Sequence, residues 1–339
     1  MSAIAIDAAS KAALREARED LSDFSLPFVI DQSRLRGRLV RLPGLVDDLL
    51  RRHDYPAAVE RQLAELLAAT AAVAPVLKAE ARLTVQIKGD GPLSLLFADR
   101  DPNGGLRALA NLDRDQLAKL EARRSTHALD FAGLLGQGHM ALTLITREKP
   151  YQAITPLAEP SLAAALTAHF RQSAQLEIGL RLAAERDASG RWQAAAILLE
   201  RLPELGGKAA PETSYSRAET RLTPDAASQA RLAARDAEAE RWQRNLAFLH
   251  SVEDQELLDP ELSAEALLYR LFHHDGVRTA KPQALSRVCR CSKERIKTVL
   301  MSLSRKDLAD CFDDDGQIES VCEFCGTVYR LSATDLATA

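Results

Sequence analysis

Cysteines occur only near the C-terminal end of this chain of 339 residues, where most of them are closely paired. Residues 1–288 contain none, and all five follow, at Cys289, Cys291, Cys311, Cys322 and Cys325. One pair reads Cys-Arg-Cys and the other Cys-Glu-Phe-Cys-Gly, in which the glycine allows a tight turn beneath a metal. Two short loops that each offer two thiolates suit tetrahedral zinc. The sequence therefore predicts one zinc ion per chain, bound by Cys289, Cys291, Cys322 and Cys325.

The same four sulfurs could also sense oxidants, because a thiolate is the nucleophile that peroxide attacks. Each sulfur has a neighbour one or two residues away, so a sulfenic acid formed on one could be resolved locally as a disulfide. Zinc would then leave, and a small unit that depends on zinc would lose about 10 kcal/mol of folding energy. On spacing alone, a purely structural zinc site remains an alternative.

The segment between the pairs has its own start and turn signals. Ser292 can cap a helix whose apolar positions include Ile296 and Leu300. Short strands at 317–321 and 327–331 should form a hairpin around the second pair. Cys311 is unpaired by spacing, so we expect it to be a buried apolar residue rather than a fifth ligand.

The rest of the chain predicts an α+β fold with largely antiparallel sheet. Three hairpins are expected, and the sequence Gly-Asp-Gly-Pro at 89–92 reads as the turn of one of them. Helical patterns fall at 45–52, 56–77 and 161–171. We divide the chain into an N-terminal extension (1–23), a mixed helix and sheet domain (24–205), a helical linker (206–279) and a small C-terminal zinc-binding domain (280–339).

The linker region has a composition unlike its neighbours. Residues 206–224 are polar and rich in turn formers, and a helix rich in Ala, Arg and Glu should follow. Between Asp225 and Asn245 the only large apolar residues are Leu232 and Trp242, so this helix gains little burial. It could melt when a neighbour unfolds, or it could be an ordinary solvent-exposed linker helix.

Composition excludes several function classes. The formal net charge of −4 offers no general attraction to phosphate backbones, and no basic patch stands out, so no nucleic-acid partner is expected. The first residues lack the pattern of a secretory signal, and the longest apolar run is too short to cross a bilayer. We therefore expect a cytoplasmic protein without a membrane partner. No nucleophile comes with an identifiable base, which argues against an enzyme.

At several blocks the sequence resembles the redox-regulated 33 kDa chaperonins, the HslO-type family of heat-shock proteins. The Cys-Arg-Cys-Ser-Lys-Glu-Arg and Cys-Glu-Phe-Cys-Gly segments stand at the spacing of that family. Further matching blocks begin at Asp31, Arg52, Gly89, His169 and Leu271. Together the resemblance covers roughly residues 24–203 and 240–336.

This resemblance implies an ATP-independent holdase that binds unfolding proteins under oxidative stress. The reduced, zinc-bound form would be inactive. Oxidation would form the disulfides Cys289–Cys291 and Cys322–Cys325, release zinc and unfold the linker, so that residues 24–205 could bind clients. The resemblance further implies a homodimer when oxidised, and transfer of clients to an ATP-dependent chaperone system after reduction.

Two rival functions use the same cysteines. A zinc-ribbon module would bind nucleic acid or a protein partner in the reduced state and lose binding when the metal is removed. A thiol oxidoreductase using Cys322 and Cys325 would need a reactive thiol at a helix start, which the surrounding hairpin pattern does not supply.

Overall fold

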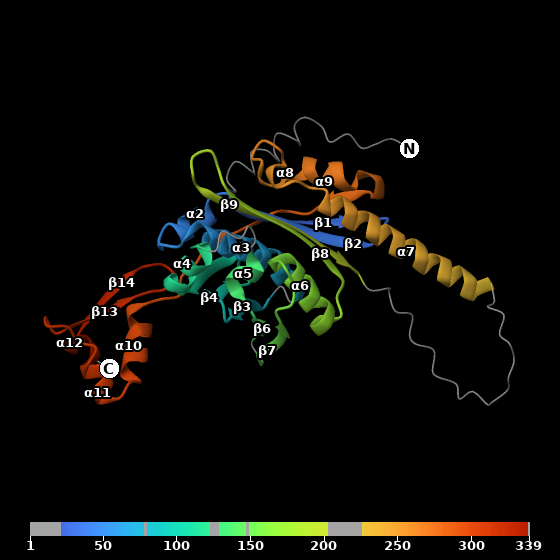
Figure 1. Ribbon diagram of the computed structural model, residues 1–339. Coiled ribbons are helices and arrows are strands. Elements are labelled where there is room, and N and C mark those ends of the chain that lie inside the picture. The colour runs from blue at the N-terminus through green and yellow to red at the C-terminus, as the bar shows by residue number, and fades with distance from the viewer. Residues whose placement is uncertain (1–21, 78–79, 123–128, 147–148, 203–225, 338–339) are drawn as a thin grey trace, which may run out of the picture.

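The computed structural model describes residues 22–77, 80–122, 129–146, 149–202 and 226–337. Helices and largely antiparallel sheet form the main body, a helical region crosses one side of it, and a small unit projects at the C-terminal end (Figure 1). The predicted α+β class is confirmed. Within the described residues, no helix combines the length and the hydropathy needed to cross a bilayer.

Sheet A contains strands from both ends of the chain. Its order is β10-β1-β2-β9-β8, with β11 also paired to β1. All of its pairings are antiparallel. The strands are β1 (Phe24–Ile30), β2 (Leu35–Leu42), β8 (Ile178–Arg186), β9 (Trp192–Arg201), β10 (Val277–Thr279) and β11 (Gln283–Ala284).

Sheet B contains two of the predicted hairpins, and the third, β1–β2, lies in sheet A. The strand order of sheet B is β12-β5-β4-β3-β6-β7, and only the β12–β5 pairing is parallel. The hairpin β3–β4 forms around the predicted turn at 89–92, and β6–β7 forms another of the expected hairpins. The strands are β3 (Arg82–Gly89), β4 (Leu93–Arg100), β5 (Gly105–Leu112), β6 (Gly138–Ile145), β7 (Tyr151–Pro156) and β12 (Ser286–Arg287).

The main core lies around the long helix α3 (Ala57–Leu77), which contacts strands of both sheets. Most α3 residues are buried, because sheets cover the helix on more than one side. Burial on several sides explains why the sequence of α3 is apolar over such a long run. Shorter helices surround the core: α2 (Leu45–Leu50), α4 (Arg114–Ala122), α5 (Phe131–Leu135), α6 (Leu162–His169) and the π-helical turn η1 (Phe170–Ala174).

A second core lies on the other face of sheet A, beneath a layer that we call the helical cover. The cover consists of α7 (Ala226–His250), α8 (Asp254–Leu258), α9 (Ala264–Phe272) and the 3₁₀ turn η2 (His273–Asp275). Phe28 and Ile197 of sheet A pack there with Trp242 and Leu249 of α7 and with Phe272 of α9. The C-terminal half of α7 is therefore well packed, so the expectation that this helix gains little burial was wrong for that half. The scarcity of large apolar residues holds only before Asn245.

A buried polar cluster fastens the helical cover to the β1–β2 turn. The carboxylate of Asp275 accepts hydrogen bonds from Ser33 Oγ, from Asn245 Nδ2 over 3.0 Å and from Arg244 Nη2 over 2.7 Å. Burial alone would raise the pKa of Asp275, but the bonds from Arg244, Ser33 and Asn245 outweigh it and lower the pKa to about 2. The carboxylate is thus charged at neutral pH and holds α7 and η2 on sheet A.

The C-terminal unit, which we call the cysteine module, has a very small core. Leu300, Ile318, Leu331 and Leu336 form it. Its elements are α10 (Lys293–Met301), α11 (Arg305–Ala309), β13 (Gln317–Val321), β14 (Val328–Ser332) and α12 (Ala333–Ala337). The predicted helix cap at Ser292 and the predicted hairpin both form. The boundaries 1–23, 24–205, 206–279 and 280–339 stay predictions, and residues 1–21 and 203–225 lie outside the described residues.

Candidate metal centre

Four cysteine sulfurs meet at one point between the N-terminal end of α10 and the β13–β14 turn. The Sγ atoms of Cys289, Cys291, Cys322 and Cys325 all lie within 4.8 Å of one another. Adjacent pairs are 3.2 Å (Cys289–Cys291), 3.6 Å (Cys289–Cys322) and 3.4 Å (Cys291–Cys325) apart. A tetrahedral zinc ion with Zn–S bonds of about 2.3 Å has ligands about 3.8 Å apart. The spacing therefore suits such an ion.

Each pair is held by a different local structure. Cys289 and Cys291 follow β12 closely and end at the Ser292 cap of α10, whose side chain accepts a hydrogen bond from the amide of Arg295. Cys322 and Cys325 lie in the turn between β13 and β14, where the Gly326 amide donates to the Cys322 carbonyl over 2.8 Å. Gly326 has a φ of +68°, a conformation that favours glycine. The Cys-x-x-Cys-Gly turn thus has the predicted geometry.

The surroundings make the four thiols unequal. Burial raises the pKa of Cys289 to about 12 and also raises that of Cys322. Burial opposes ionisation of Cys325 too, but hydrogen bonding to Thr327 outweighs it and lowers its pKa to about 6. Four thiolates this close would repel one another strongly unless a cation lay between them. The site can therefore hold four ionised sulfurs only with a positive ion at its centre.

Two polar side chains beside the sulfurs were not anticipated from the sequence. The hydroxyl of Tyr329, on β14, donates a hydrogen bond to Cys291 Sγ over 3.0 Å. Thr327 Oγ1 lies 3.2 Å from Cys325 Sγ. Hydrogen bonds of this kind orient metal ligands and moderate their reactivity. Thr327 and Tyr329 follow the second cysteine pair closely in the sequence. That position could have marked them as candidates, because residues flanking a metal-binding turn often supply such contacts.

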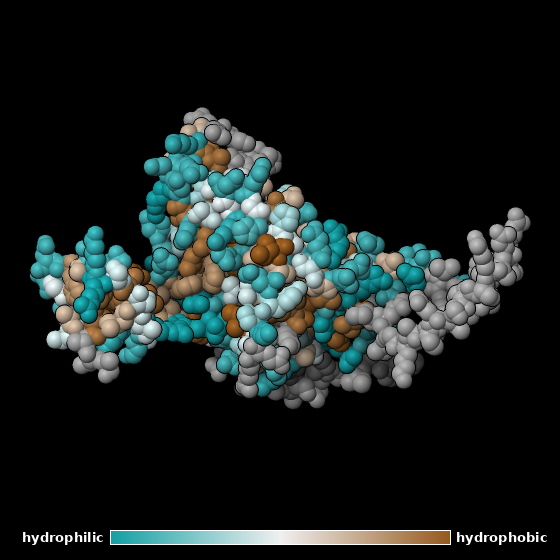
Figure 2. All heavy atoms as spheres, turned by 90° about the horizontal axis from the view of Figure 1, so that it is seen from below, coloured by the Kyte–Doolittle hydropathy of each residue, from teal (hydrophilic) through white to brown (hydrophobic). Residues whose placement is uncertain are grey.

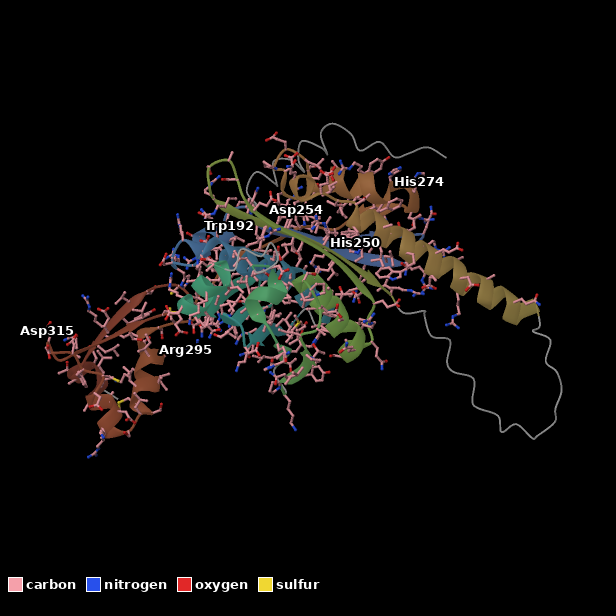
Figure 3. All side chains as sticks on the ribbon, viewed as in Figure 1. Trp192, His250, Asp254, His274, Arg295 and Asp315 are labelled. Atoms are coloured by element: carbon pink, nitrogen blue, oxygen red, sulfur yellow. The ribbon has the colours of Figure 1, made fainter. Side chains whose placement is uncertain are left out.

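The prediction for Cys311 was partly wrong. Its side chain is exposed rather than buried, and its thiol donates to the Asp307 carbonyl over 3.2 Å. Helix α11 ends at Ala309, so Cys311 lies in the turn beyond it and not on a packed helical face. It does not belong to the four-sulfur cluster. Figure 3 shows yellow sulfur atoms inside the cysteine module, which carries Arg295 on α10 and Asp315 at a far turn.

The cysteine module is also continuous with the main body. Strand β12 pairs with β5 of sheet B, and the Val288 amide donates to the Leu106 carbonyl over 2.9 Å, directly before Cys289. The first cysteine pair therefore emerges from the edge of sheet B. This attachment was not predictable from local sequence patterns, because β12 is only two residues long.

Comparison with known families identifies the family of this chain. The family model described as Hsp33 protein matches residues 23–332, which is most of the chain. The chain belongs to the Hsp33 family. A 33 kDa chaperonin of Caulobacter vibrioides is 34% identical over 319 residues, which cover 92% of this chain and 95% of that protein. A 33 kDa chaperonin of Shewanella woodyi is 32% identical over 311 residues, covering 91% and 93%.

A solved member of the Hsp33 family has the same fold. The crystal structure of the heat shock protein 33 homolog from Thermotoga maritima superposes with a TM-score of 0.70 and 21% identity, covering 93% of this chain and 96% of that one. The predicted family resemblance is thus confirmed. The relatives of this chain are named 33 kDa chaperonins, so the family is one of chaperones.

Proposed function

We propose that this protein is a redox-regulated, ATP-independent holdase. In its reduced state Cys289, Cys291, Cys322 and Cys325 hold one zinc ion, and the protein is inactive. The observation that carries the proposal is the convergence of these four sulfurs within 4.8 Å in a module whose own core is only four residues. A unit this small depends on its metal for folding, because so little apolar surface is buried.

The oxidative step is balanced by two molecules of peroxide. In each pair, one thiolate attacks a peroxide oxygen and becomes a sulfenic acid as hydroxide leaves. The neighbouring thiolate then attacks the sulfenic sulfur, forms the disulfide and expels hydroxide, which takes a proton from the solvent. The bonds formed are Cys289–Cys291 and Cys322–Cys325. Disulfide sulfurs are poor zinc ligands, so the four residues would no longer hold Zn²⁺, and the cysteine module would lose its main stabilising interaction.

Client binding then uses apolar surface that is hidden in the resting protein. On the face shown in Figure 2, hydrophobic residues are interspersed with hydrophilic ones. The second core supplies a hidden surface, because lifting the helical cover would expose Phe28, Ile30, Leu39 and Ile197 of sheet A. Such an apolar face is what a holdase needs to bind unfolding chains. We assign client binding to this part of residues 24–205.

The remaining features of the proposal concern assembly and location. The oxidised protein associates as a homodimer, since two exposed apolar faces can bury each other, and it passes clients to an ATP-dependent chaperone system after reduction. It works in the cytoplasm, where free thiols and a reversible disulfide are compatible with the reducing conditions. Neither nucleic acid nor membrane is a partner.

The test compares the same sample before and after oxidation. Reduced protein should contain one zinc ion per chain and should not suppress aggregation of a thermally unfolding client. Hydrogen peroxide with mild heat should release the zinc and switch suppression on, and dithiothreitol with zinc should switch it off. Equal suppression before and after oxidation would contradict the proposal. Binding to a partner in the reduced state, lost on metal removal, would instead favour a zinc-ribbon interaction module.

A further inference from the structure

Each cysteine pair places one of its intervening residues on the same spot of sheet B. Arg290 stands between Cys289 and Cys291, and Phe324 stands between Cys322 and Cys325. Arg290 contacts Asp99, and Phe324 contacts Arg107. Asp99 on β4 and Arg107 on β5 lie directly opposite each other. The metal centre and the body of the protein are thus joined through two residues that the metal-binding loops themselves present.

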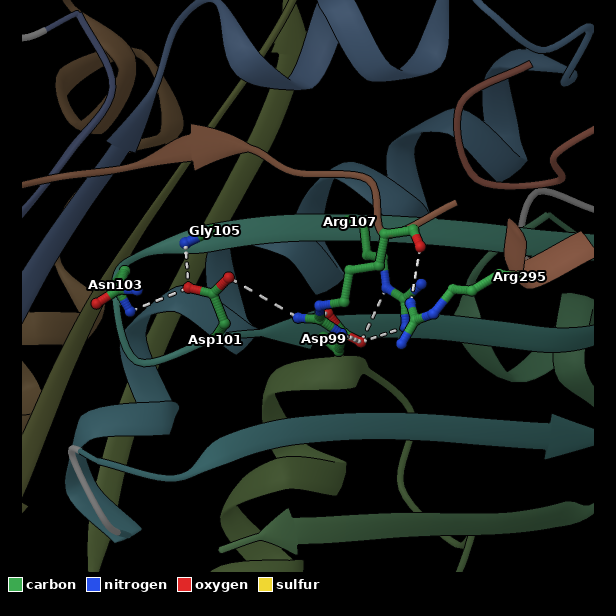
Figure 4. Close-up of polar contacts among 7 residues, drawn as sticks. Asp99, Asp101, Asn103, Gly105, Arg107 and Arg295 are labelled. Carbon is green, nitrogen blue, oxygen red and sulfur yellow. Dashed lines mark hydrogen bonds and ion pairs between the residues drawn. The ribbon is translucent and has the colours of Figure 1, made fainter. Parts of the chain in front are cut away.

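The Arg290 contact is a buried ion pair. Its guanidinium lies 3.0 Å (Nη1) and 3.3 Å (Nη2) from the two carboxylate oxygens of Asp99, whose side chain is only 2% exposed. A second carboxylate, Asp101 Oδ2, is 3.9 Å away. Arg295 Nη1 donates to the Arg290 carbonyl over 2.7 Å, which ties the same residue to α10. Figure 4 shows this network over β4 and β5.

The Phe324 contact is aromatic. The guanidinium carbon of Arg107 lies 4.1 Å from the centre of the Phe324 ring, and the Phe97 ring meets it edge to face at 5.5 Å. Arg107 is itself fixed, because its Nε and Nη2 donate to Asp99 Oδ2 over 2.9 and 2.8 Å. Asp99 therefore links the two contacts: it binds Arg290 directly and orients Arg107 beneath Phe324.

We propose that Arg290 and Phe324 form a two-point latch, which holds the cysteine module on sheet B only while the four cysteines are fixed as one rigid unit. This inference rests on the proposed function and names how the metal centre is coupled to the body. With both points on one rigid module, the second contact forms at high effective concentration once the first exists. When the two cysteine pairs separate, each contact must form alone, and the advantage of the pair is lost.

Release through this latch leaves no charge stranded in the body. Asp99 keeps both hydrogen bonds from Arg107 when Arg290 departs, so the carboxylate remains paired. The departing Arg290 guanidinium enters water. Opening is therefore reversible. Coupling is also reciprocal: a latch that favours the zinc-bound module must strengthen zinc binding by the same free energy. We expect this stronger binding to appear as slower release of zinc.

The test measures zinc release from the full-length, reduced, zinc-loaded chain. We compare the wild type with Arg290→Ala and with Arg330→Ala, a control that removes an exposed arginine paired with Glu319 on the β13–β14 hairpin, away from sheet B. Zinc release after addition of hydrogen peroxide is followed with a chromogenic chelator. Arg290→Ala should shorten the half-time about tenfold, within the usual range of coupling between sites. Amide exchange at Val288 in the unoxidised protein should rise as well. Arg330→Ala should change neither.

A second variant guards against a folding defect in the first. Phe324→Leu retains an apolar side chain but removes the ring that stacks on Arg107, and it too should hasten zinc release. Equal half-times for both variants and Arg330→Ala, with unchanged Val288 exchange, would overturn the latch. This readout is independent of chaperone activity: if oxidised wild type fails to suppress aggregation, the proposed function falls while the zinc half-times still decide on the latch.

Discussion

The hydroxyl of Tyr329 donates a hydrogen bond to the Sγ atom of Cys291 over 3.0 Å, from the strand that follows the second cysteine pair. This bond orients one sulfur of the first pair and spreads its negative charge. We predict that Tyr329→Phe, which keeps the ring, weakens zinc binding about tenfold, as removal of such supporting partners does in other metal sites. Competition with a chromogenic zinc chelator measures the change.

Tyr151→Phe is the matched control for that variant. Tyr151 is exposed on β7, at the edge of sheet B opposite β12. Its substitution removes the same hydroxyl group, but far from the metal centre. Its zinc affinity should equal that of the wild type. If Tyr329→Phe also matched the wild type, the hydrogen bond would have no part in metal binding.

The Asp275 cluster should control the helical cover independently of the metal. Asp275→Asn removes the charge that binds Arg244 and weakens the bonds from Ser33 and Asn245. The cover should lose about 2–3 kcal/mol, and α9 amides should exchange faster at neutral pH. Because the pKa of Asp275 is lowered to about 2, its contribution is complete above its ordinary value of 3.8 and declines only as pH falls towards 2.

The chaperone activity of Asp275→Asn distinguishes the effect of releasing the helical cover from the effect of oxidising the four cysteines. The variant should suppress client aggregation without oxidant while still containing one zinc ion per chain. Asp236→Asn, a same-charge change at an exposed position of α7, is the control and should remain inactive until oxidised. An Asp275→Asn protein that stays inactive when reduced would argue against sheet A as the client-binding surface.

Cys311 should be dispensable for the metal centre. It is exposed, it stands outside the four-sulfur cluster, and its thiol donates to the Asp307 carbonyl. We predict that Cys311→Ser binds one zinc ion with unchanged affinity and responds to peroxide as the wild type does. Cys325→Ser, which alters the buried sulfur, should lose zinc. Zinc analysis with a count of reactive thiols measures both, and a zinc deficit in Cys311→Ser would refute the assignment.

Removing the metal from reduced protein should unfold the cysteine module alone at first. Its core of four residues cannot replace a metal contribution of about 10 kcal/mol. Amides of β13 and β14 should lose their protection against hydrogen exchange once a strong chelator is added, whereas amides of α3, buried in the main core, should keep theirs. Protected β13–β14 amides in the metal-free protein would show that the module folds without zinc.

Local patterns predicted much of the fold and the four-cysteine cluster. Strand-like patterns located the β3–β4 and β6–β7 hairpins, a turn signal marked the first of them, and the long apolar run located α3. The cysteine cluster was predictable because zinc requires closely paired ligands, and its pairs are short in sequence. Such features depend on neighbours along the chain, so sequence alone contains their cause.

Long-range contacts were not predictable in the same way. Strands β10, β11 and β12 have two or three residues each, too few for any periodicity to be seen. The buried face of α7 rests on scattered residues such as Trp242 and Leu249, whose partners come from sheet A. The pairing of Arg290 with Asp99 joins positions 191 residues apart. A single sequence read by itself contains no signal that matches such distant partners.

The short strands β10, β11 and β12 have a consequence for synthesis of the chain. Strands β1 and β5 acquire these outer neighbours only from residues 277–287 of a polypeptide of 339. Until a ribosome has delivered that segment, both strands expose unpaired backbone groups, which can template wrong pairing. A protein of this design is thus itself a vulnerable nascent chain until residues 277–287 have been made.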